Sequence, residues 1–409
     1  MWGKVNRKCL SLPRLYQNNR METFTIDPMD SILLGIIGGL LLIQALYFVC
    51  LYLRIPRHKK AVEQGRETFN TDCPPLSVIL YANDAYEDIE ANLTALLEQD
   101  YPQFEVIVIT DGKEDSTSDG LKRLQQTYPH LYHSFIPDSS RYISRKKLAL
   151  TLGIKAAKYD WLVMTEADCR PRTNQWLRLL ARNFTPGTEV VLGYCGYERG
   201  KGWLHKRVAY DRLFLSMRYL GFAFRHPYMG LGRNFAYRKK AFYQNKGFSG
   251  HLNLLRGDDD LFVNQAATSD NTRVETDADA VVQQSQPTRR KEWREEKIGY
   301  ASTARFYRGW QRYALGWETC TRLLFHAAWI GTLTWSIQQK HWLVAGIAFL
   351  AFAIRYLLQI YAVNQNAKAL REPRRYYLTL PVFDILQPLQ SLRWKLYCTV
   401  RRKSEFMRK

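Results

Sequence analysis

The stretch that decides the fold is Trp161–Pro171, with the sequence WLVMTEADCRP. Its apolar run, WLVM, ends abruptly before two acids, Glu166 and Asp168, which are separated by one residue. A buried strand that stops at carboxylates delivers them to the carboxyl end of a sheet, where open α/β folds bind their ligands. Two acids at this spacing can hold a divalent cation that carries a diphosphate. On its own, E-x-D is most often a polar turn after a strand. The sequence around it must distinguish such a turn from a metal site.

Strand-like and helix-like patterns alternate around this stretch. The other predicted strands span 76–82, 104–110, 131–136 and 189–194, and the predicted helices span 88–99, 121–128 and 146–157. Such a run predicts an α/β fold, with a mostly parallel sheet that carries helices on both faces.

Acids also follow the first two predicted strands. Asp84 comes after the strand at 76–82, and Asp111 comes directly after the strand at 104–110. Packing of the core explains why the strands are apolar but not why each of them ends at an acid. Acids at the ends of several strands therefore predict a nucleotide-sugar site at that edge of the sheet. The chain contains neither G-x-G-x-x-G nor G-x-x-x-x-G-K-[ST], which disfavours a dinucleotide enzyme and a P-loop NTPase. Without a glycine-rich cradle, a diphosphate needs a metal ion and basic side chains.

Apolar segments on both sides of this region predict a membrane protein. Residues 32–53 carry no charge and are long enough to span a bilayer. The stretches 323–337 and 342–363 predict a transmembrane hairpin, whereas 376–397 contains prolines and polar groups and predicts an interfacial or re-entrant segment. The net charge of +21 is concentrated near these segments. Basic residues interleaved with Trp and Tyr indicate lipid headgroups here rather than nucleic acid.

The flanking charges predict an orientation. Residues 1–20 are basic, but Met21 opens an acidic stretch, METFTIDPMD, and we expect translation to begin there. With that start, the positive-inside rule places the chain after Arg54 in the cytoplasm. The seven cysteines form no C-x-x-C pair, so they indicate neither a zinc site nor a disulfide framework. This agrees with a reducing compartment.

From about Pro75 to Tyr300 the chain resembles the family 2 glycosyltransferases, and in particular bacterial polysaccharide and lipid-linked glycan synthases with a GT-A fold. The first block that carries the resemblance is LSVILYANDAYEDIEANLTALLEQDYPQFEVIVITDGKEDST. The resemblance implies that Asp84 and Asp111 hold the base and ribose of a UDP- or GDP-sugar.

A second block, RKKLALTLGIKAAKYDWLVMTEADCRP, resembles the family's lysine helix and metal-binding D-x-D. It implies that Lys146 faces the nucleotide, with Lys147 as a close competitor. It also implies a Mg²⁺ or Mn²⁺ ion held directly by Asp168, with Glu166 standing at the first position of the D-x-D.

Two further blocks resemble the acceptor side of the family. GLGRNFAYRKKAF, at 230–242, implies that Gly232 and Asn234 shape the floor beneath the sugar. GDDDLFVNQAA, at 257–267, implies the carboxylate that takes a proton from the acceptor hydroxyl. Alignment on G-D-D makes Asp259 the base, which we favour, and alignment on the downstream Asp-Leu makes it Asp258. Acids at a helix start also cap the helix, which is the competing structural explanation.

One block departs from the family. Processive members carry Q-x-x-R-W, but WREEKIGY at 293–300 places Glu296, Gly299 and Tyr300 at the Gln, Arg and Trp positions. A diphosphate leaving group needs positive charge nearby. The expected substitutes are Arg294, assigned to the acceptor side, Lys297 or Arg305. The departure favours transfer of single sugars over polymer synthesis.

The expected domains follow from these patterns. They are an N-terminal flank (1–30), a transmembrane helix (31–53), a basic linker (54–74), a GT-A domain (75–300), a basic aromatic interfacial segment (301–322), a transmembrane hairpin (323–363), and a basic loop, interfacial or re-entrant segment and tail (364–409).

The sequence thus predicts a metal-dependent, inverting glycosyltransferase at the cytoplasmic face of a bacterial inner membrane. Its expected partners are a nucleotide-diphospho-sugar donor, a lipid-linked or cell-surface glycan acceptor, and membrane lipids, with no nucleic acid. The alternative is a non-catalytic scaffold that binds nucleotide or glycan, which the altered motif at 293–300 supports and the acids at Asp111, Asp168 and Asp259 oppose. A nucleotidyltransferase would carry a loop rich in glycine and basic residues after its first strand, where this chain has the acidic YANDAYED.

Overall fold

The computed structural model describes residues 27–82, 86–111, 116–136, 144–287 and 289–400. The expected start at Met21 and the predicted site residue Asp84 therefore lie outside the described residues. The chain divides into two units, and each is described by itself below. One contains residues up to Gln44 together with Thr321–Tyr356, and the other contains Ala45–Cys320 and Leu357–Lys409.

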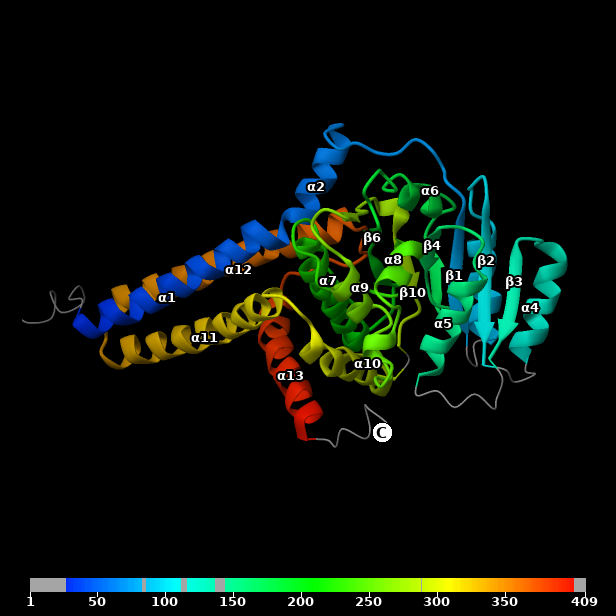
Figure 1. The fold of residues 1–409 in the computed structure, drawn as a ribbon. Coiled ribbons are helices and arrows are strands. Elements are labelled where there is room, and N and C mark those ends of the chain that lie inside the picture. Colours follow the sequence, from blue (N-terminus) through cyan, green and yellow to red (C-terminus); the bar gives the residue numbers. More distant parts are fainter. Residues whose placement is uncertain (1–26, 83–85, 112–115, 137–143, 288, 401–409) are drawn as a thin grey trace, which may run out of the picture. The chain divides into compact units, whose positions relative to one another are not determined.

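The larger unit is built on a seven-stranded sheet with the order β3-β2-β1-β4-β8-β6-β9 (Figure 1). The strands are β1 (Leu76–Ala82), β2 (Phe104–Thr110), β3 (Leu131–Phe135), β4 (Trp161–Met164), β6 (Val190–Leu192), β8 (Phe235–Arg238) and β9 (Thr272–Val274). β1 pairs in parallel with β2 and β4, and β2 pairs in parallel with β3. β8 is antiparallel to both of its neighbours, β4 and β6. The predicted α/β fold with a mostly parallel sheet is confirmed, and all five predicted strands are present in it.

Helices cover both faces of the parallel part of the sheet, which explains why β1, β2 and β4 are mostly apolar on both faces. Alternate residues of β1 and β2, such as Val78 and Val106, pack with Leu93 of α3 (Tyr86–Leu97) in one core cluster. The residues between them, such as Ile79, face α5 (Arg145–Ala156) on the other side. α4 (Ser116–Thr127) packs beside α3 and β3.

Gly153 of α5 allows this helix to lie directly on the sheet. A Cβ atom at this position would stand 2.8 Å from Ile79 Cγ2. We therefore expect Gly153→Ala to lower the free energy of unfolding by about 1–3 kcal/mol, because overpacking forces neighbouring side chains to shift. Thermal unfolding in detergent would measure this. Gly316→Ala is the matched control, since no atom lies within 4 Å of its added Cβ, and equal melting temperatures for the two variants would contradict the prediction.

A small second sheet, with the order β5-β10-β7, begins directly after the acidic pair of the central stretch. It consists of β5 (Cys169–Pro171), β7 (Cys195–Tyr197) and β10 (Val282–Gln284). β4 ends at Met164, so the acids that were predicted to end a strand lie in the short connection between the two sheets. Their side chains consequently sit at the junction of β4, β5 and β10.

The remaining helices of this unit complete the domain. They are α2 (Arg54–Glu63), α6 (Trp176–Ala181), α7 (Trp203–Ala223), α8 (Lys239–Gln244), α9 (Asp260–Ala266), α10 (Arg290–Thr303) and α13 (Leu380–Val400), with short 3-10 turns at Ser249–His251, Ala278–Ala280 and Ala304–Phe306. α13 occupies the predicted interfacial segment and packs against α10 and α7. It leaves a stripe of apolar residues exposed, at Val382, Ile385, Leu389, Leu392 and Leu396. This spacing of three and four residues is that of an amphipathic helix, although its place at a membrane surface stays a prediction.

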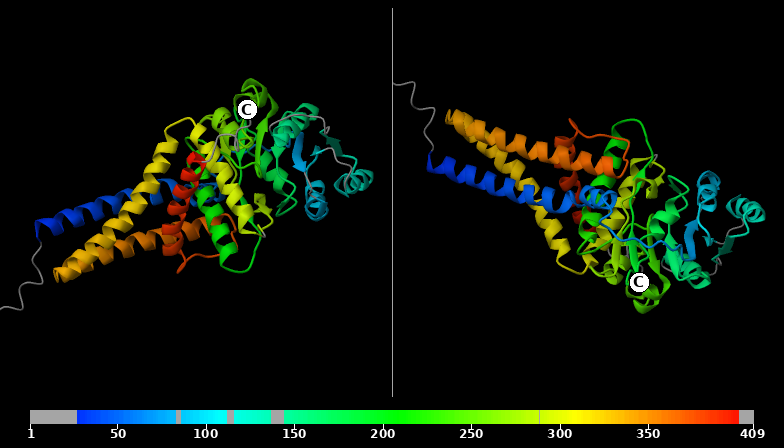
Figure 2. Two further views of the ribbon diagram at one scale, coloured as in Figure 1. Left: turned by 90° about the horizontal axis from the view of Figure 1, so that it is seen from below. Right: turned by 90° about the horizontal axis from the view of Figure 1, so that it is seen from above.

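Two helices of the described chain are long and apolar enough to cross a membrane (Figure 2). The first runs from Pro28 to Glu63 through α1 (Pro28–Tyr47), a π-helical turn (Phe48–Tyr52) and α2, and the second is α12 (Trp342–Ala369). These helices contain the predicted spans at 31–53 and 342–363. α11 (Gln311–Gln338) contains the apolar stretch 323–337 but is not a third such helix by the same measure, so its crossing stays a prediction.

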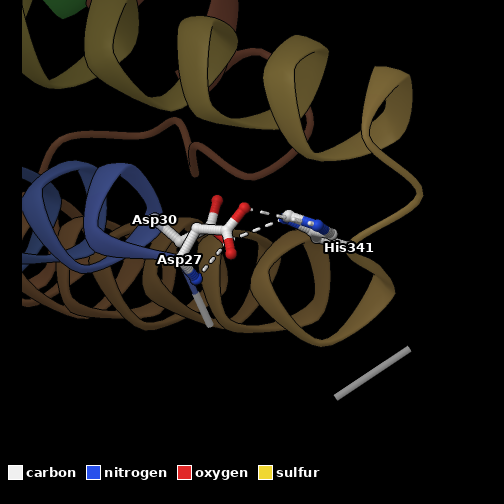
Figure 3. A group of neighbouring side chains, drawn as sticks. All are labelled: Asp27, Asp30 and His341. Carbon is white, nitrogen blue, oxygen red and sulfur yellow. Dashed lines mark hydrogen bonds and ion pairs between the residues drawn. The ribbon is translucent and has the colours of Figure 1, made fainter. Parts of the chain in front are cut away.

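In the smaller unit, a polar cluster joins the start of α1 to the start of α12 (Figure 3). His341 Nδ1 lies 2.7 Å from Oδ2 of the fully buried Asp30, and Trp335 Nε1 donates to Asp30 Oδ1 at 3.2 Å. The Asp27 backbone amide also donates to Asp30, and the Asp27 carboxylate lies 3.9 Å from His341 Nε2. The three side chains are of metal-ligating types, but the contacts of Asp30 within the unit already account for its burial. These contacts therefore connect the start of α1 to the start of α12.

Glu372, just after α12, is buried in the larger unit with 3% of its surface exposed. It accepts a hydrogen bond from Tyr194 at 3.2 Å, and burial raises its pKa to about 7 despite the nearby Arg374. Between about pH 4.5 and 7 the folded chain keeps a proton that the unfolded chain loses, so stability falls as the pH rises through this window. The effect of this one group is on the order of 3 kcal/mol.

We expect Glu372→Gln to remove this loss, so that its melting temperature falls less between pH 5 and 7.5 than that of the wild type. The exposed Glu90 supplies the matched control variant, Glu90→Gln. Parallel melting curves for the wild type and Glu372→Gln across this pH range would show that Glu372 does not carry the titration.

Candidate active site

A polar pocket opens at the carboxyl end of β4, between the start of α5, the loop before β8, the loop before α9, and α10. It is lined by Lys146, Glu166, Arg233, Arg256, Asp258, Asp259, Asp260, Tyr300 and Thr303. Four of the residues that the sequence predicted for the site thus lie together here: Lys146, Glu166, Asp258 and Asp259. Together they span more than 100 positions of the sequence, from Lys146 to Asp259.

Lys146 stands between two carboxylates of this pocket. Its ammonium group lies 2.6 Å from Glu166 Oε1 and 2.8 Å from Asp258 Oδ2. Burial on its own lowers the pKa of Lys146, but the charges of Asp258 and Glu166 outweigh it and raise the pKa. Lys146 is therefore a permanent cation in the pocket.

Lys147, the competitor of Lys146 in the sequence, points elsewhere. Its buried ammonium group donates to the backbone carbonyls of His251, Leu254 and Arg256, at 2.6, 2.9 and 2.9 Å. Lys147 thus ties α5 to the loop that leads into α9, and it does not line the pocket. Of the two lysines, the structure places only Lys146 toward the candidate site.

Glu166 and Asp168 follow β4, as predicted, but differ in their surroundings. Glu166 is paired with Lys146 and also with Arg233, whose Nε lies 2.9 Å from Glu166 Oε2. Burial alone raises the pKa of Glu166, whereas Arg233 and Lys146 lower it to about 2. Asp168 accepts a hydrogen bond of 2.6 Å from Gln284 on β10 and has no ion pair among the described residues.

Glu166 and Asp168 form a group with Cys169 in which the potential ligand atoms all lie within 4.8 Å of one another. Carboxylate oxygens are the donors that Mg²⁺ and Mn²⁺ prefer. Burial raises the pKa of the Cys169 thiol, so it stays protonated and is a poor ligand for a hard cation. The donor set thus fits a divalent cation held by Asp168, which has fewer partners, and by Glu166.

Asp258 and Asp259 are the two candidates for the base, and both are buried at the wall of the pocket. Although burial opposes it, the charge of Lys146 lowers the pKa of Asp258. In Asp259, burial and the neighbouring charge of Asp258 raise the pKa. Asp259 is consequently the more basic of the two carboxylates, which agrees with its choice as the proton acceptor but does not test it.

Three hydrogen bonds orient Asp259. Its Oδ1 accepts from the Asp260 backbone amide at 2.8 Å, which caps α9. Its Oδ2 accepts from the Gly232 amide at 2.9 Å and from the Tyr300 hydroxyl at 3.2 Å. Gly232, predicted for the acceptor side, therefore contacts the candidate base directly. A Cβ at position 232 would stand 3.2 Å from Asp259 Cβ, so a larger residue here would have to displace Asp259 by a few tenths of an ångström.

Asp260 lies deeper than its two neighbours. The hydroxyls of Thr303 and Tyr307 both donate to its carboxylate. Burial and the charge of Asp259 raise the pKa of Asp260 to about 7. Asp260 thus joins α9 to α10 and to the turn that follows α10, and these hydrogen bonds hold this wall of the pocket in place.

The other predicted site residues lie outside the pocket lining. Asp111 follows β2 and is paired with Arg145, which also donates to the Asp111 carbonyl at 2.8 Å. Asn234 is buried among Trp176, Tyr194 and Ala280, with which its amide forms three hydrogen bonds. Asn234 does not line the pocket, so its predicted role on the acceptor side stays a prediction.

The expected replacements for the missing motif arginine do not line the pocket either. Lys297 is paired with Asp211 at 2.6 Å, and Arg294 and Arg305 lie exposed outside the pocket lining. The pocket instead contains Arg233 and Arg256, which the sequence did not single out. Arg233 stands within the quoted block at 230–242, so its place there was the only available signal. Arg256 comes one residue before the block at 257–267, and nothing local marked it.

The position predicted for the motif glutamine is occupied by Glu296, which forms a network with arginines. Glu296 Oε1 lies 2.8 Å from Arg212, and Arg233 stands 4.0 Å from its Oε2. The two arginines and Lys297 lower the pKa of Glu296, although burial opposes them. Arg233 thus faces Glu166 with its Nε and Glu296 with its Nη2.

Comparison with known proteins bears on the family and the fold of this chain. Residues 77–246 match the profile of Glycosyl transferase family 2. The chain is 28% identical over 93 residues to a poly-beta-1,6-N-acetyl-D-glucosamine synthase of Staphylococcus epidermidis, covering 23% of this chain and 21% of that protein. It is 23% identical over 141 residues to the uncharacterized glycosyltransferase YibD of Escherichia coli K12, covering 34% of this chain and 39% of that protein. The alignments thus span between a fifth and two fifths of these relatives.

A solved structure shares the fold over most of the chain. The mannosyltransferase PcManGT from Pyrobaculum calidifontis, in complex with GDP-Man and Mn²⁺, superposes with a TM-score of 0.51 and 17% identity, over 89% of this chain and 99% of that one. This similarity confirms the expected GT-A fold. Residues 77–246 thus match Glycosyl transferase family 2 in sequence, and most of the chain has the GT-A fold.

Proposed function

We propose that the chain is an inverting glycosyltransferase that moves a sugar from a nucleoside-diphosphate donor to a hydroxyl group of a membrane-associated acceptor. The observation that carries the proposal is the buried Asp259, whose raised pKa suits a base and which lies in a pocket with three cations. Such a combination provides both proton transfer and stabilisation of a departing diphosphate.

Asp259 accepts the proton of the acceptor hydroxyl as the oxygen attacks the anomeric carbon. The new C–O bond forms on the face opposite to the nucleotide, and the bond to the diphosphate breaks with its electron pair leaving on the phosphate oxygen. Tyr300 and the Gly232 amide keep the Asp259 carboxylate in one orientation during this transfer. Lys146 and Arg233 provide positive charge beside Glu166, at the end of β4.

Asp168 and Glu166 would hold a Mg²⁺ or Mn²⁺ ion, in keeping with their carboxylate donors. When bound, the ion neutralises charge on the donor diphosphate. Asp111, at the end of β2, is assigned to the nucleoside, and Asp84 after β1 is assigned with it. The nucleoside is proposed to be of the UDP or GDP type.

The acceptor is proposed to be a lipid-linked or cell-surface glycan, with the reaction on the cytoplasmic face of a bacterial inner membrane. The support comes from two apolar helices of membrane-spanning length and from the exposed apolar stripe of α13. A non-catalytic scaffold is the second candidate, since position 299 lacks the motif arginine. The intact pocket with a well-oriented Asp259 favours the enzyme.

The test is nucleotide release by the purified, detergent-solubilised full chain against a panel of UDP-, GDP- and TDP-sugars, with Mn²⁺ or with EDTA. We expect slow, metal-dependent hydrolysis of one donor even without acceptor. Metal-dependent binding of a donor without release would point to a required acceptor. Neither binding nor release with any donor would overturn the proposal and favour the scaffold.

A further inference from the structure

Two of the three cations that line the pocket are already committed to carboxylates. Lys146 lies between Glu166 and Asp258, and Arg233 lies between Glu166 and Glu296. Arg256 differs. Among the residues that the structure describes, its guanidinium has no ion pair within 4 Å and no hydrogen bond, and the residue is exposed at the pocket. It is the pocket cation whose donors remain available for an incoming anion.

The Arg256 side chain lies against Gly299 of α10. A Cβ atom at position 299 would stand 2.4 Å from Arg256 Cδ and 2.6 Å from its Nε. A Cβ at position 299 would force the end of the Arg256 side chain to move, so the place that Arg256 occupies here depends on glycine at this position. Gly299 is also the position at which the Q-x-x-R-W motif has its arginine. The guanidinium therefore lies next to the backbone from which a motif arginine would extend.

The backbone of Arg256 is firmly held. Its carbonyl accepts a hydrogen bond of 2.9 Å from Lys147, which also binds the carbonyls of His251 and Leu254. The next residue, Gly257, has a φ of +104°, a conformation that residues with a side chain rarely adopt. Arg256 is thus presented from a fixed loop, directly before the acids of the candidate base.

We propose that Arg256 binds the diphosphate of the donor and supplies, from the loop before α9, the positive charge that a motif arginine would supply from α10. The inference rests on the proposed function. A guanidinium presents a planar fork of donors that matches two phosphate oxygens, and unlike Lys146 and Arg233 it need not break an existing ion pair to do so. Arg256 therefore contributes most to affinity for phosphate and little to affinity for the nucleoside.

The experiment compares binding of UDP and GDP with binding of uridine and guanosine, by calorimetry on the full chain with Mn²⁺. For whichever diphosphate the wild type binds, we expect Arg256→Gln to weaken binding about 10- to 100-fold, the usual effect of losing hydrogen bonds to a charged group. Binding of the matching nucleoside is expected to change by less than about twofold, since the nucleoside reports only structural damage. Arg123→Gln, on the exposed face of α4, is the control and is expected to match the wild type.

A double variant tests the relocation itself. Arg256→Gly removes the side chain that Gly299→Arg would clash with, so the pair of changes moves the arginine from the loop to α10. We expect this double variant to bind the diphosphate more tightly than Arg256→Gln does. Unchanged diphosphate affinity in Arg256→Gln, with a wild type that binds, would overturn the inference and leave the proposed function standing. A wild type that binds neither diphosphate would overturn the proposed function together with the inference.

Discussion

Asp259→Asn is expected to lower donor turnover by about 10²- to 10⁴-fold, the usual contribution of a general base. The amide cannot accept the proton of the acceptor hydroxyl. Asn caps a helix as well as Asp does, so α9 should keep its start, which the Asp259 side chain now caps through the Asp260 amide. Nucleotide binding is expected to stay within a few-fold of the wild type, because Lys146 and Arg256 are untouched. Single-turnover transfer, with nucleotide affinity measured in parallel, gives both values.

Asp270→Asn is the matched control, because Asp270 is an exposed acid in the loop that follows α9. The decisive comparison is with Asp258→Asn. Asp258 is neutralised by Lys146, so its loss is expected to disturb nucleotide binding as well as turnover. Unchanged turnover in Asp259→Asn would move the role of base to Asp258.

Asp168→Asn is expected to lower metal-supported donor turnover by about 100-fold or more, since stabilisation of phosphate charge by a metal ion is worth several kcal/mol. The reason lies in the unequal pairing of the two acids after β4. Glu166 is already bound by Lys146 and Arg233, whereas Asp168 accepts only uncharged donors. Affinity for Mn²⁺, measured by water-proton relaxation in the absence of donor, is expected to fall with turnover.

The exposed Asp72 supplies the control variant, Asp72→Asn. Glu166→Gln should separate the roles of the two acids, because it also removes the partner of two cations and is expected to destabilise the pocket. If Asp168→Asn bound Mn²⁺ as tightly as the wild type, Asp168 could not be the direct ligand.

The parallel core of the sheet could be predicted from the sequence because β1 and β2 are apolar except for Ser77 and Glu105 and end sharply. The predicted ranges 76–82 and 104–110 are those of β1 and β2. The boundaries of other elements were less accurate. α4 begins at Ser116 rather than 121, since its first turn is polar and carries no apolar periodicity. β4 ends at Met164 because the chain crosses there into the second sheet, a tertiary feature without a local signal.

The acids of the site were predictable, but the cations were predicted only in part. Glu166 follows from a strand end, whereas Asp258 and Asp259 were predicted from the resemblance to the family's acidic motif. Lys146 could not be separated from Lys147 by spacing, because the choice depends on which carbonyl groups lie beneath α5. Arg256 enters the pocket through its contact with Gly299, 43 positions further along the chain, and no local pattern encodes such a contact.

The Lys147 ammonium group has a consequence for attempts to re-engineer this domain. It fastens the helix that carries Lys146 to the loop that carries Arg256, and this loop runs directly into the acids at 258–260. The residues proposed to bind the donor and the residue proposed to remove the proton therefore lie on connected segments that move together. Substitutions that shift α5 to admit a different nucleotide will therefore also displace the base.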